Sequence, residues 1–206
     1  MSNESKTASL FRELIRNQGY YRDPAVRIEE GRSEVPKIRK LLRAAAKHGV
    51  EKEYPDFIIT RDGYPELVIV AECKSDPGRH QSEGMDHYET YAVDGALLYA
   101  SFLSREYDVL AIGISGETAD TLRISHFIHL RGERGANPYF EDRILPIKEY
   151  REGIRKSTYK FNQDYQKLLA YTKTLNELLH ARKIKESQRA LLISGILIAL
   201  RNDAFR

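Results

Sequence analysis

The sequence YPDFIITRDGYPELVIVAECK, residues 54–74, decides the fold of this chain. It contains two stretches rich in Ile, Val, Leu and Phe, 57–60 and 66–74, which are typical of β-strands. Between them stands Arg61-Asp62-Gly63, and Asp-Gly tolerates the positive φ angles that a tight turn requires. The stretch therefore predicts a β-hairpin.

This hairpin brings three charged side chains together. Because side chains alternate along a strand, Glu72 and Lys74 project from one face and Cys73 from the other. If the strands pair antiparallel, Asp56 at the start of the first strand lies beside Glu72 and Lys74 at the end of the second. We therefore expect two carboxylates and one ammonium group to converge at one edge of the sheet.

These residue types suit the hydrolysis of a phosphodiester with the help of a metal ion. Mg²⁺ takes oxygen ligands and keeps several waters, so one or two carboxylates and a substrate phosphate are enough to hold it. Asp56 and Glu72 are the candidate ligands, together with the backbone carbonyl of Cys73. Such an ion lowers the pKa of a bound water and neutralises charge on the phosphate. Lys74 is the candidate for orienting or deprotonating that water.

The pattern Pro55-Asp56, fifteen residues, then Glu72-Cys73-Lys74 resembles the PD-(D/E)xK nuclease superfamily. The resemblance implies that Asp56, Glu72 and Lys74 are catalytic. In many members a Glu on the first core helix also reaches the metal, which makes Glu34 a candidate third acid. Glu34 is equally explained as a carboxylate that the helix dipole favours near a helix start. Glu-x-Lys alone is most often a solvated strand end.

The order of predicted elements agrees with that superfamily. Helical spacing, continuous apolar runs and alternation predict helices at 8–18, from Val35, and at 85–105, and strands at 57–60, 66–74, 107–115 and 121–130, with one more strand possible within 20–28. In the helix predicted at 85–105, His87 and Tyr91 would share a face, with a buried, hydrogen-bonded histidine as the expected role. The fold class is α/β: a restriction-endonuclease-like αβββαβ core with a mixed sheet flanked by helices, in which the connection through the helix at 85–105 joins parallel strands.

Composition sets limits on other classes of protein. A chain of 206 residues is one domain or one domain with an appendage, and its single cysteine excludes a disulfide framework or a cysteine-rich zinc site. No signal peptide or membrane span is predicted, so we expect a cytoplasmic protein.

The charges are unevenly distributed along the chain. Residues 147–206 hold 13 Lys and Arg against 6 Asp and Glu, whereas residues 1–146 hold 20 Lys and Arg against 24 Asp and Glu. The basic tail could follow nucleic-acid phosphates or could be solvated helix faces.

The C-terminal part predicts a helical extension. Residues 130–145 are rich in charge, Gly and Pro, which places a boundary between a nuclease domain at 1–145 and an extension at 146–206. Helices are predicted at 162–184 and from Ser187, and the second is so apolar that we expect a fragment or N-terminal domain of a larger enzyme. The alternatives are that it packs on the long helix or on a second copy. Neither Asn-Pro-Pro-Tyr nor a glycine-rich S-adenosylmethionine loop is present, so this chain is not expected to methylate.

Four segments carry a closer resemblance: 37–49 (KIRKLLRAAAKHG), 54–76, 91–117 and 122–133 (LRISHFIHLRGE). They resemble the N-terminal nuclease domain of type IIG and type I-like restriction–modification enzymes, in which a nuclease precedes an N6-adenine DNA methyltransferase. The resemblance implies a type II-like restriction endonuclease activity: cleavage of double-stranded DNA that depends on Mg²⁺, with Mn²⁺ as a substitute. It also implies methyltransferase and target-recognition domains in the same or a partner chain, and a possible homodimer.

Two other functions use the same residues. The chain could be a non-cleaving nucleic-acid-binding or assembly domain built on the same fold, or a DNA repair nuclease. The joint presence of Asp56, Glu72 and Lys74 favours an enzyme over a binding module. The basic tail and the closer resemblance favour restriction over repair.

Overall fold

The computed structural model describes residues 4–46, 54–139 and 142–201. It forms two compact units, one ending at Arg155 and one beginning at Lys156. The first unit is an α/β structure built on a six-stranded sheet, and the second consists of helices. The charged residues singled out in the hairpin all belong to the first unit.

The sheet is mixed, and its strands lie in sequence order. They are β1 (Val26–Glu29), β2 (Phe57–Arg61), β3 (Leu67–Lys74), β4 (Asp108–Ser115), β5 (Arg123–His129) and β6 (Asn137–Tyr139). Only β3 and β4 pair in parallel, and the other neighbours pair antiparallel. The parallel pair requires a crossover, which contains α3.

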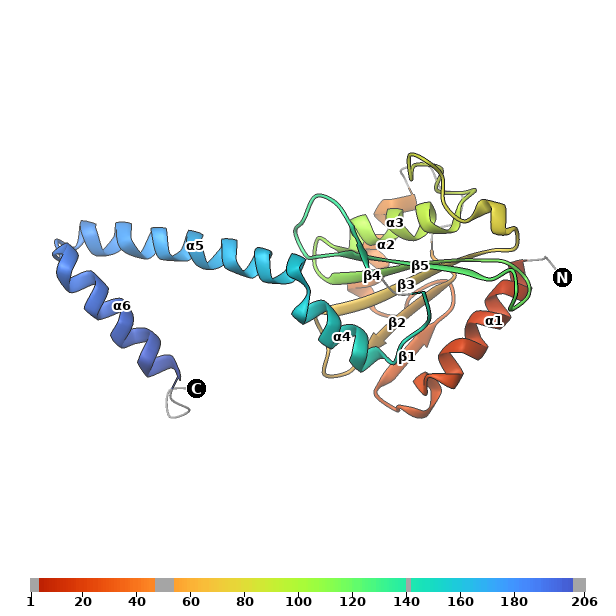
Figure 1. The fold of residues 1–206 in the computed structure, drawn as a ribbon, viewed down its shortest axis with the longest axis horizontal. Coiled ribbons are helices and arrows are strands. Elements are labelled where there is room, and N and C mark those ends of the chain that lie inside the picture. Colours follow the sequence, from red (N-terminus) through yellow and green to blue (C-terminus); the bar gives the residue numbers. More distant parts are fainter. Residues whose placement is uncertain (1–3, 47–53, 140–141, 202–206) are drawn as a thin grey trace. The chain divides into compact units, whose positions relative to one another are not determined.

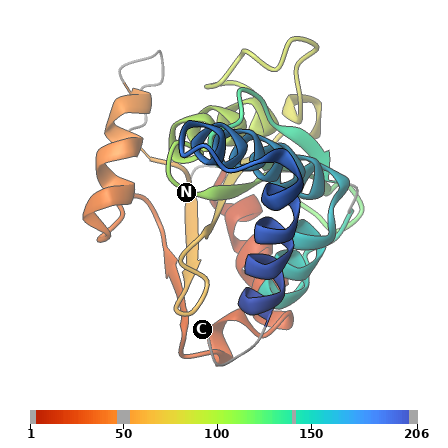
Figure 2. The same cartoon turned by 90° about the vertical axis from the view of Figure 1, so that its left-hand side faces the viewer.

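Helices cover both faces of this sheet. In the first unit they are α1 (Glu4–Asn17), α2 (Pro36–Ala46), α3 (Ala92–Leu103) and α4 (Ile147–Lys156), with single 3₁₀ turns η1 (Tyr20–Arg22) and η2 (Pro77–Arg79). Figures 1 and 2 show α1 and α4 on one side of the sheet and α2 and α3 on the other. Because both sides are covered, β3 and β4 are buried along their whole length.

The alternation along β3 divides the core into two layers. Its odd-numbered residues, such as Ile69 and Cys73, pack in the layer that contains residues of α1 and α4. Its even-numbered residues Val68 and Val70 pack in the layer with α2 and α3. Glu72 and Lys74 continue the even-numbered row, so they lie on the face that α2 and α3 cover.

The predicted α/β class and element order are confirmed. The order α1, β1, β2, β3, α3, β4 is αβββαβ, and β1 is the additional strand anticipated near residues 20–28. The helix that begins at Pro36 is an insertion between β1 and β2. As a consequence, the helix that precedes the three strands is α1.

The helix predicted at 85–105 is wrong in its first seven residues. Residues 85–91 are not helical, and α3 begins at Ala92. The reason is a tertiary interaction: Asp94 accepts hydrogen bonds from the backbone N–H groups of Ser82 and His87, which holds the preceding segment as a loop. Met85 in that loop has φ of 53°, which no α-helix permits.

The second unit contains α5 (Thr158–Ala181) and α6 (Glu186–Arg201), which confirms two predicted helices. Ser157 caps α5 by accepting the N–H of Lys160. At its other end, Lys183 has φ of 60° and Ile184 donates its N–H to the carbonyl of Leu179, as in a Schellman motif. Among the described helices, none combines the length and apolarity that crossing a membrane requires.

A glycine in β4 sets the distance between α3 and the sheet. A Cβ atom on Gly113 would lie 2.7 Å from the backbone nitrogen of Val93 and 2.8 Å from its Cα. Gly113 pairs with Glu72 across β3 and β4, so this closest approach of α3 occurs beside the predicted site. Gly113 therefore fixes the distance between the first turn of α3 and the sheet next to Glu72.

We expect Gly113→Ala to destabilise the protein by about 2–3 kcal/mol, because overpacking against backbone atoms forces α3 to move. Urea unfolding measures this change. The control is Gly135→Ala, since nothing lies within 4 Å of a Cβ there, and we expect a change within about 0.5 kcal/mol. Equal stabilities of the two variants would contradict the close approach.

Candidate active site

The register of β2 and β3 brings Asp56 and Glu72 together. Phe57, the first residue of β2, pairs with Ala71, so Asp56 just before β2 lies next to Glu72 of β3. Glu72 continues the row of Val70 in the layer with α2 and α3, and the negative charges of Glu72 and Asp56 both act on Tyr99 of α3. Asp56 Oδ2 also accepts the N–H of Cys73 at 2.8 Å, which ties the start of β2 to β3.

Glu72 and Lys74 are more enclosed than a strand end usually is. Their exposed fractions are 3% and 8%, so this Glu-x-Lys is not the solvated strand end that the pattern alone most often indicates. Contacts from outside the hairpin also hold the backbone at this strand end. The carbonyl of Lys74 accepts the N–H of Gly116 at 3.0 Å and the hydroxyl of Thr7 from α1 at 3.3 Å.

The carboxylate of Glu72 lies deep in the site. Its Oε1 atom is buried and accepts no hydrogen bond from the described residues, while the residue has other interactions. A Cβ on Gly95 of α3 would lie 3.3 Å from Glu72 Cγ, so the helix backbone passes directly over this side chain. Oxygen donors from Glu72 and the half-buried Asp56 on one face form a set that suits Mg²⁺.

Tyr99 is a neighbour of the site that the sequence did not reveal. It is buried, and burial together with the negative charges of Glu72, Asp56 and Glu89 raises the pKa of its phenol. It lies one helical turn after Gly95, and residues four apart share a helix face. From the sequence alone Tyr99 is one more position in the apolar pattern of α3. Its closeness to Glu72 and Asp56 becomes visible only when the helix is seen packed on the sheet.

Glu34 is not brought to the carboxylate pair. Its side chain is 82% exposed and lies 3.5 Å from the guanidinium of Arg27. Arg27 pairs with Thr60, four residues along β2 from Asp56, which is about 13 Å at the rise of a strand. Glu34 also precedes α2, the inserted helix, and so does not belong to the first core helix.

Glu29 is the acid of β1 on the same face as the pair. It pairs with Ile58, and its exposed fraction is 9%. One of its carboxylate oxygens accepts the hydroxyl of Ser33 at 2.6 Å and the other accepts the N–H of Glu34 at 2.7 Å. Glu29 therefore closes the turn that follows β1.

A cavity of about 370 Å³ adjoins Asp56. Its lining includes Arg12 of α1 and Tyr54, with Glu30 and Gly31, which follow β1. The guanidinium of Arg12 makes two hydrogen bonds to the carboxylate of Glu30, at 2.7 and 2.6 Å. This ion pair neutralises the cation, so the cavity gives access to Asp56 without adding a net charge.

His80 fastens the segment after Lys74 to the sheet. Its Nδ1 lies 2.9 Å from the hydroxyl of Ser115 and its Nε2 lies 2.8 Å from that of Ser125. Ser115 pairs with Lys74 across β3 and β4, so this contact is made beside the site. Burial, with a smaller effect of the positive charge of Arg123, lowers the pKa of His80 to about 4. His80 is therefore neutral at physiological pH.

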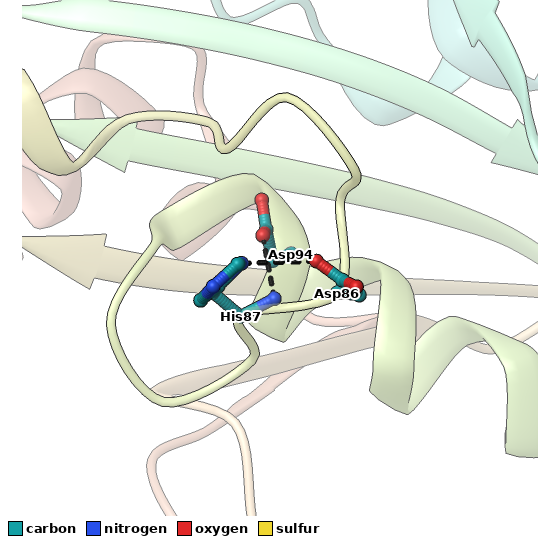
Figure 3. Close-up of side chains that lie close together, drawn as sticks. All are labelled: Asp86, His87 and Asp94. Carbon is teal, nitrogen blue, oxygen red and sulfur yellow. Dashed lines mark hydrogen bonds and ion pairs between the residues drawn. The ribbon is translucent and has the colours of Figure 1, made fainter.

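A second group of possible metal ligands lies in the loop before α3. One ligand atom each from Asp86, His87 and Asp94 lie within 4.8 Å of one another, as the close-up of Figure 3 shows. Asp86 and His87 are exposed and Asp94 is buried. The carboxylate of Asp94 already accepts the N–H and hydroxyl of Ser82 and the N–H of His87, so its evident role is to anchor the loop.

The low pKa of His80 makes the protein less stable in acid. Its folded pKa of about 4 lies below the ordinary 6.5, so the unfolded chain binds more protons and stability falls as pH drops from about 6.5 towards 4. Between about pH 7.5 and pH 5 we expect the wild type to lose about 2 kcal/mol more than His80→Gln. Urea unfolding at both pH values checks this, and parallel losses in the two proteins would contradict it.

Comparison with known proteins adds no relative to this picture. No protein-family model, curated protein or solved structure matches the chain. The candidate site consequently rests on the geometry of Asp56, Glu72 and Lys74 and on the elements that hold them.

Proposed function

We propose that this chain is a Mg²⁺-dependent endonuclease module that hydrolyses phosphodiester bonds in double-stranded DNA. One observation carries the proposal: the β2–β3 hairpin brings Asp56, just before β2, beside Glu72, which shares a sheet face with Lys74. Two acids and a lysine are the groups that metal-assisted phosphodiester hydrolysis needs. The enclosure of Glu72 and Lys74 supports a catalytic role over that of a solvated strand end.

Each residue has a separate task in this proposal. Asp56 and Glu72 hold the metal through carboxylate oxygens, with the backbone carbonyl of Cys73 as a further oxygen ligand. When bound, Mg²⁺ lowers the pKa of a water ligand and neutralises charge on the phosphate, and Mn²⁺ substitutes for it. Lys74 orients or deprotonates the attacking water and stabilises the pentacovalent phosphate. The hydrogen bond from Cys73 N–H keeps Asp56 in position for this task.

The biological setting we propose is restriction of foreign DNA. The resemblance of the nuclease segments to the N-terminal domain of restriction–modification enzymes supports it. In that setting the helical extension leads to methyltransferase and target-recognition domains, in the same or a partner chain, which supply sequence specificity. Two such modules, as in a homodimer, cut both strands. In this setting the chain acts in the cytoplasm, where it meets foreign DNA.

We expect Asp56→Asn and Lys74→Met each to lower the rate of plasmid nicking about 10³-fold or more, because each removes a group that stabilises the transition state. Conversion of supercoiled to nicked plasmid in Mg²⁺ or Mn²⁺ measures this rate, and circular dichroism confirms that the variants fold. The matched control is Asp62→Asn in the exposed turn of the same hairpin, which should cleave as the wild type does. Cleavage by either active-site variant at the wild-type rate would sink the assignment.

Metal binding tests the site apart from turnover. We expect calorimetry to show Mn²⁺ binding to the wild type that is weakened at least tenfold in Asp56→Asn, since this substitution removes one of two carboxylate ligands. The control variant Asp62→Asn should keep the wild-type affinity. A wild type that neither binds Mn²⁺ nor nicks DNA would leave a non-cleaving binding domain as the function. Binding that is unchanged in Asp56→Asn would place the metal elsewhere.

A further inference from the structure

Few cations at the active edge of the sheet remain available to a polyanion. Lys6 lies 3.3 Å from Glu117, and Arg12 is bound by both oxygens of Glu30. Lys74 is enclosed. Arg123, at the start of β5, differs from these: it is exposed and forms no ion pair with any acid among the residues that the structure describes.

The sheet register places Arg123 in one row with Lys74. Lys74 pairs with Ser115, and Ser115 pairs with Arg123. Residues paired across neighbouring strands share a face, so all three belong to the face of the proposed site. Two strand spacings separate Lys74 from Arg123, about 10 Å between their backbones. A long side chain at that distance can reach the DNA backbone next to a phosphate held at the site.

A second arginine belongs to the turn that Arg123 contacts. Arg123 donates a hydrogen bond from Nη1 to the carbonyl of Pro77, the first residue of η2, at 3.3 Å. The last residue of η2 is Arg79, whose side chain is 60% exposed and whose ion pair with the equally exposed Asp76 is long, at 4.0 Å. His80 fixes the end of this turn to β4 and β5 through its two serine contacts. A neutral imidazole at this place adds no repulsion to the two guanidinium groups.

We propose that Arg123 and Arg79 form a phosphate-binding subsite for the DNA backbone beside the cleaved bond. The inference rests on the proposed nuclease function and names how the substrate is held. Guanidinium groups pair with phosphate oxygens at short distance, and such contacts position the duplex without reading its sequence. The subsite lies on residues whose side chains take no part in the proposed chemistry.

Binding of a short fluorescein-labelled DNA duplex to the full chain in EDTA, followed by anisotropy between about 50 and 200 mM KCl, tests the subsite. We expect Arg123→Gln to weaken binding roughly tenfold. We also expect the slope of log affinity against log salt to fall by about 0.9 for each phosphate that is no longer neutralised, and further in the double variant with Arg79→Gln.

Arg105→Gln is the matched control, because Arg105 is an exposed arginine that follows α3 at the opposite end of β4. Its slope should equal that of the wild type. If the slope of log affinity against log salt is unchanged in Arg123→Gln and in the double variant, the subsite is wrong even if the wild type cleaves. The same holds if Arg105→Gln lowers that slope by an equal amount. Binding that depends on Arg123 in a wild type that does not cleave keeps the subsite and rejects the nuclease. A wild type that binds the duplex neither in EDTA nor in Mg²⁺, and does not cleave it, rejects both.

Discussion

The pairing register of β2 with β3 is the constraint on which the site depends. A shift of one residue would turn every side chain of β2 to the other face of the sheet. Here both faces are buried, so Ile58 would leave the layer of α2 and α3, and Phe57 would leave the layer of α1. Each such burial is worth about 1.5–3 kcal/mol, so the cores hold the register far more firmly than the charged groups could. The hydrophobic pattern thus positions Asp56 against Glu72.

The hairpin could be predicted from the sequence because its signals are local. Asp62-Gly63 marks the turn, and the apolar runs on both sides mark strands whose alternation assigns Glu72 and Lys74 to one face. The start of α3 could not be predicted in this way. Its position depends on the carboxylate of Asp94 binding backbone groups seven and twelve residues earlier, and this tertiary interaction overrides helical spacing.

The same distinction explains the errors within the site. The interpretation of Glu34 assumed that the helix after it was the first core helix, whereas β1 precedes that helix and makes it an insertion. The backbone carbonyl of Lys74 is held by Thr7 and Gly116, which lie far away in the sequence. Tyr99 reaches the two acids only because α3 crosses β3 at Gly95. Each of these features depends on contacts between residues far apart in the sequence. The spacing of residues within one segment carries no information about such contacts.

Burial of Glu72 and Lys74 has a cost that folding alone does not require. Removing charged groups from water is unfavourable even when they are paired, and apolar residues of similar size are often as stable or more stable. Yet Gly113 beside Glu72 and Gly95 above it allow α3 to close over the Glu72 side chain. Both glycines lower the propensity of their strand or helix, and the charges beside them are costly to bury. This combination indicates that the region is built for a functional site at some expense of stability.

Charge distribution then links metal binding to DNA binding. Residues 1–146 carry 24 acids against 20 Lys and Arg, so this part of the chain has a net charge that repels a polyanion. A divalent cation held by Asp56 and Glu72 would cancel the two negative charges nearest the proposed phosphate position. Metal would therefore raise the affinity for DNA, and DNA would raise the affinity for metal by the same factor, because coupling between two bound ligands is reciprocal. In the proposed function, the pairing of two acids on one sheet face, set by hydrophobic packing, would therefore make DNA binding tighter when the metal is bound.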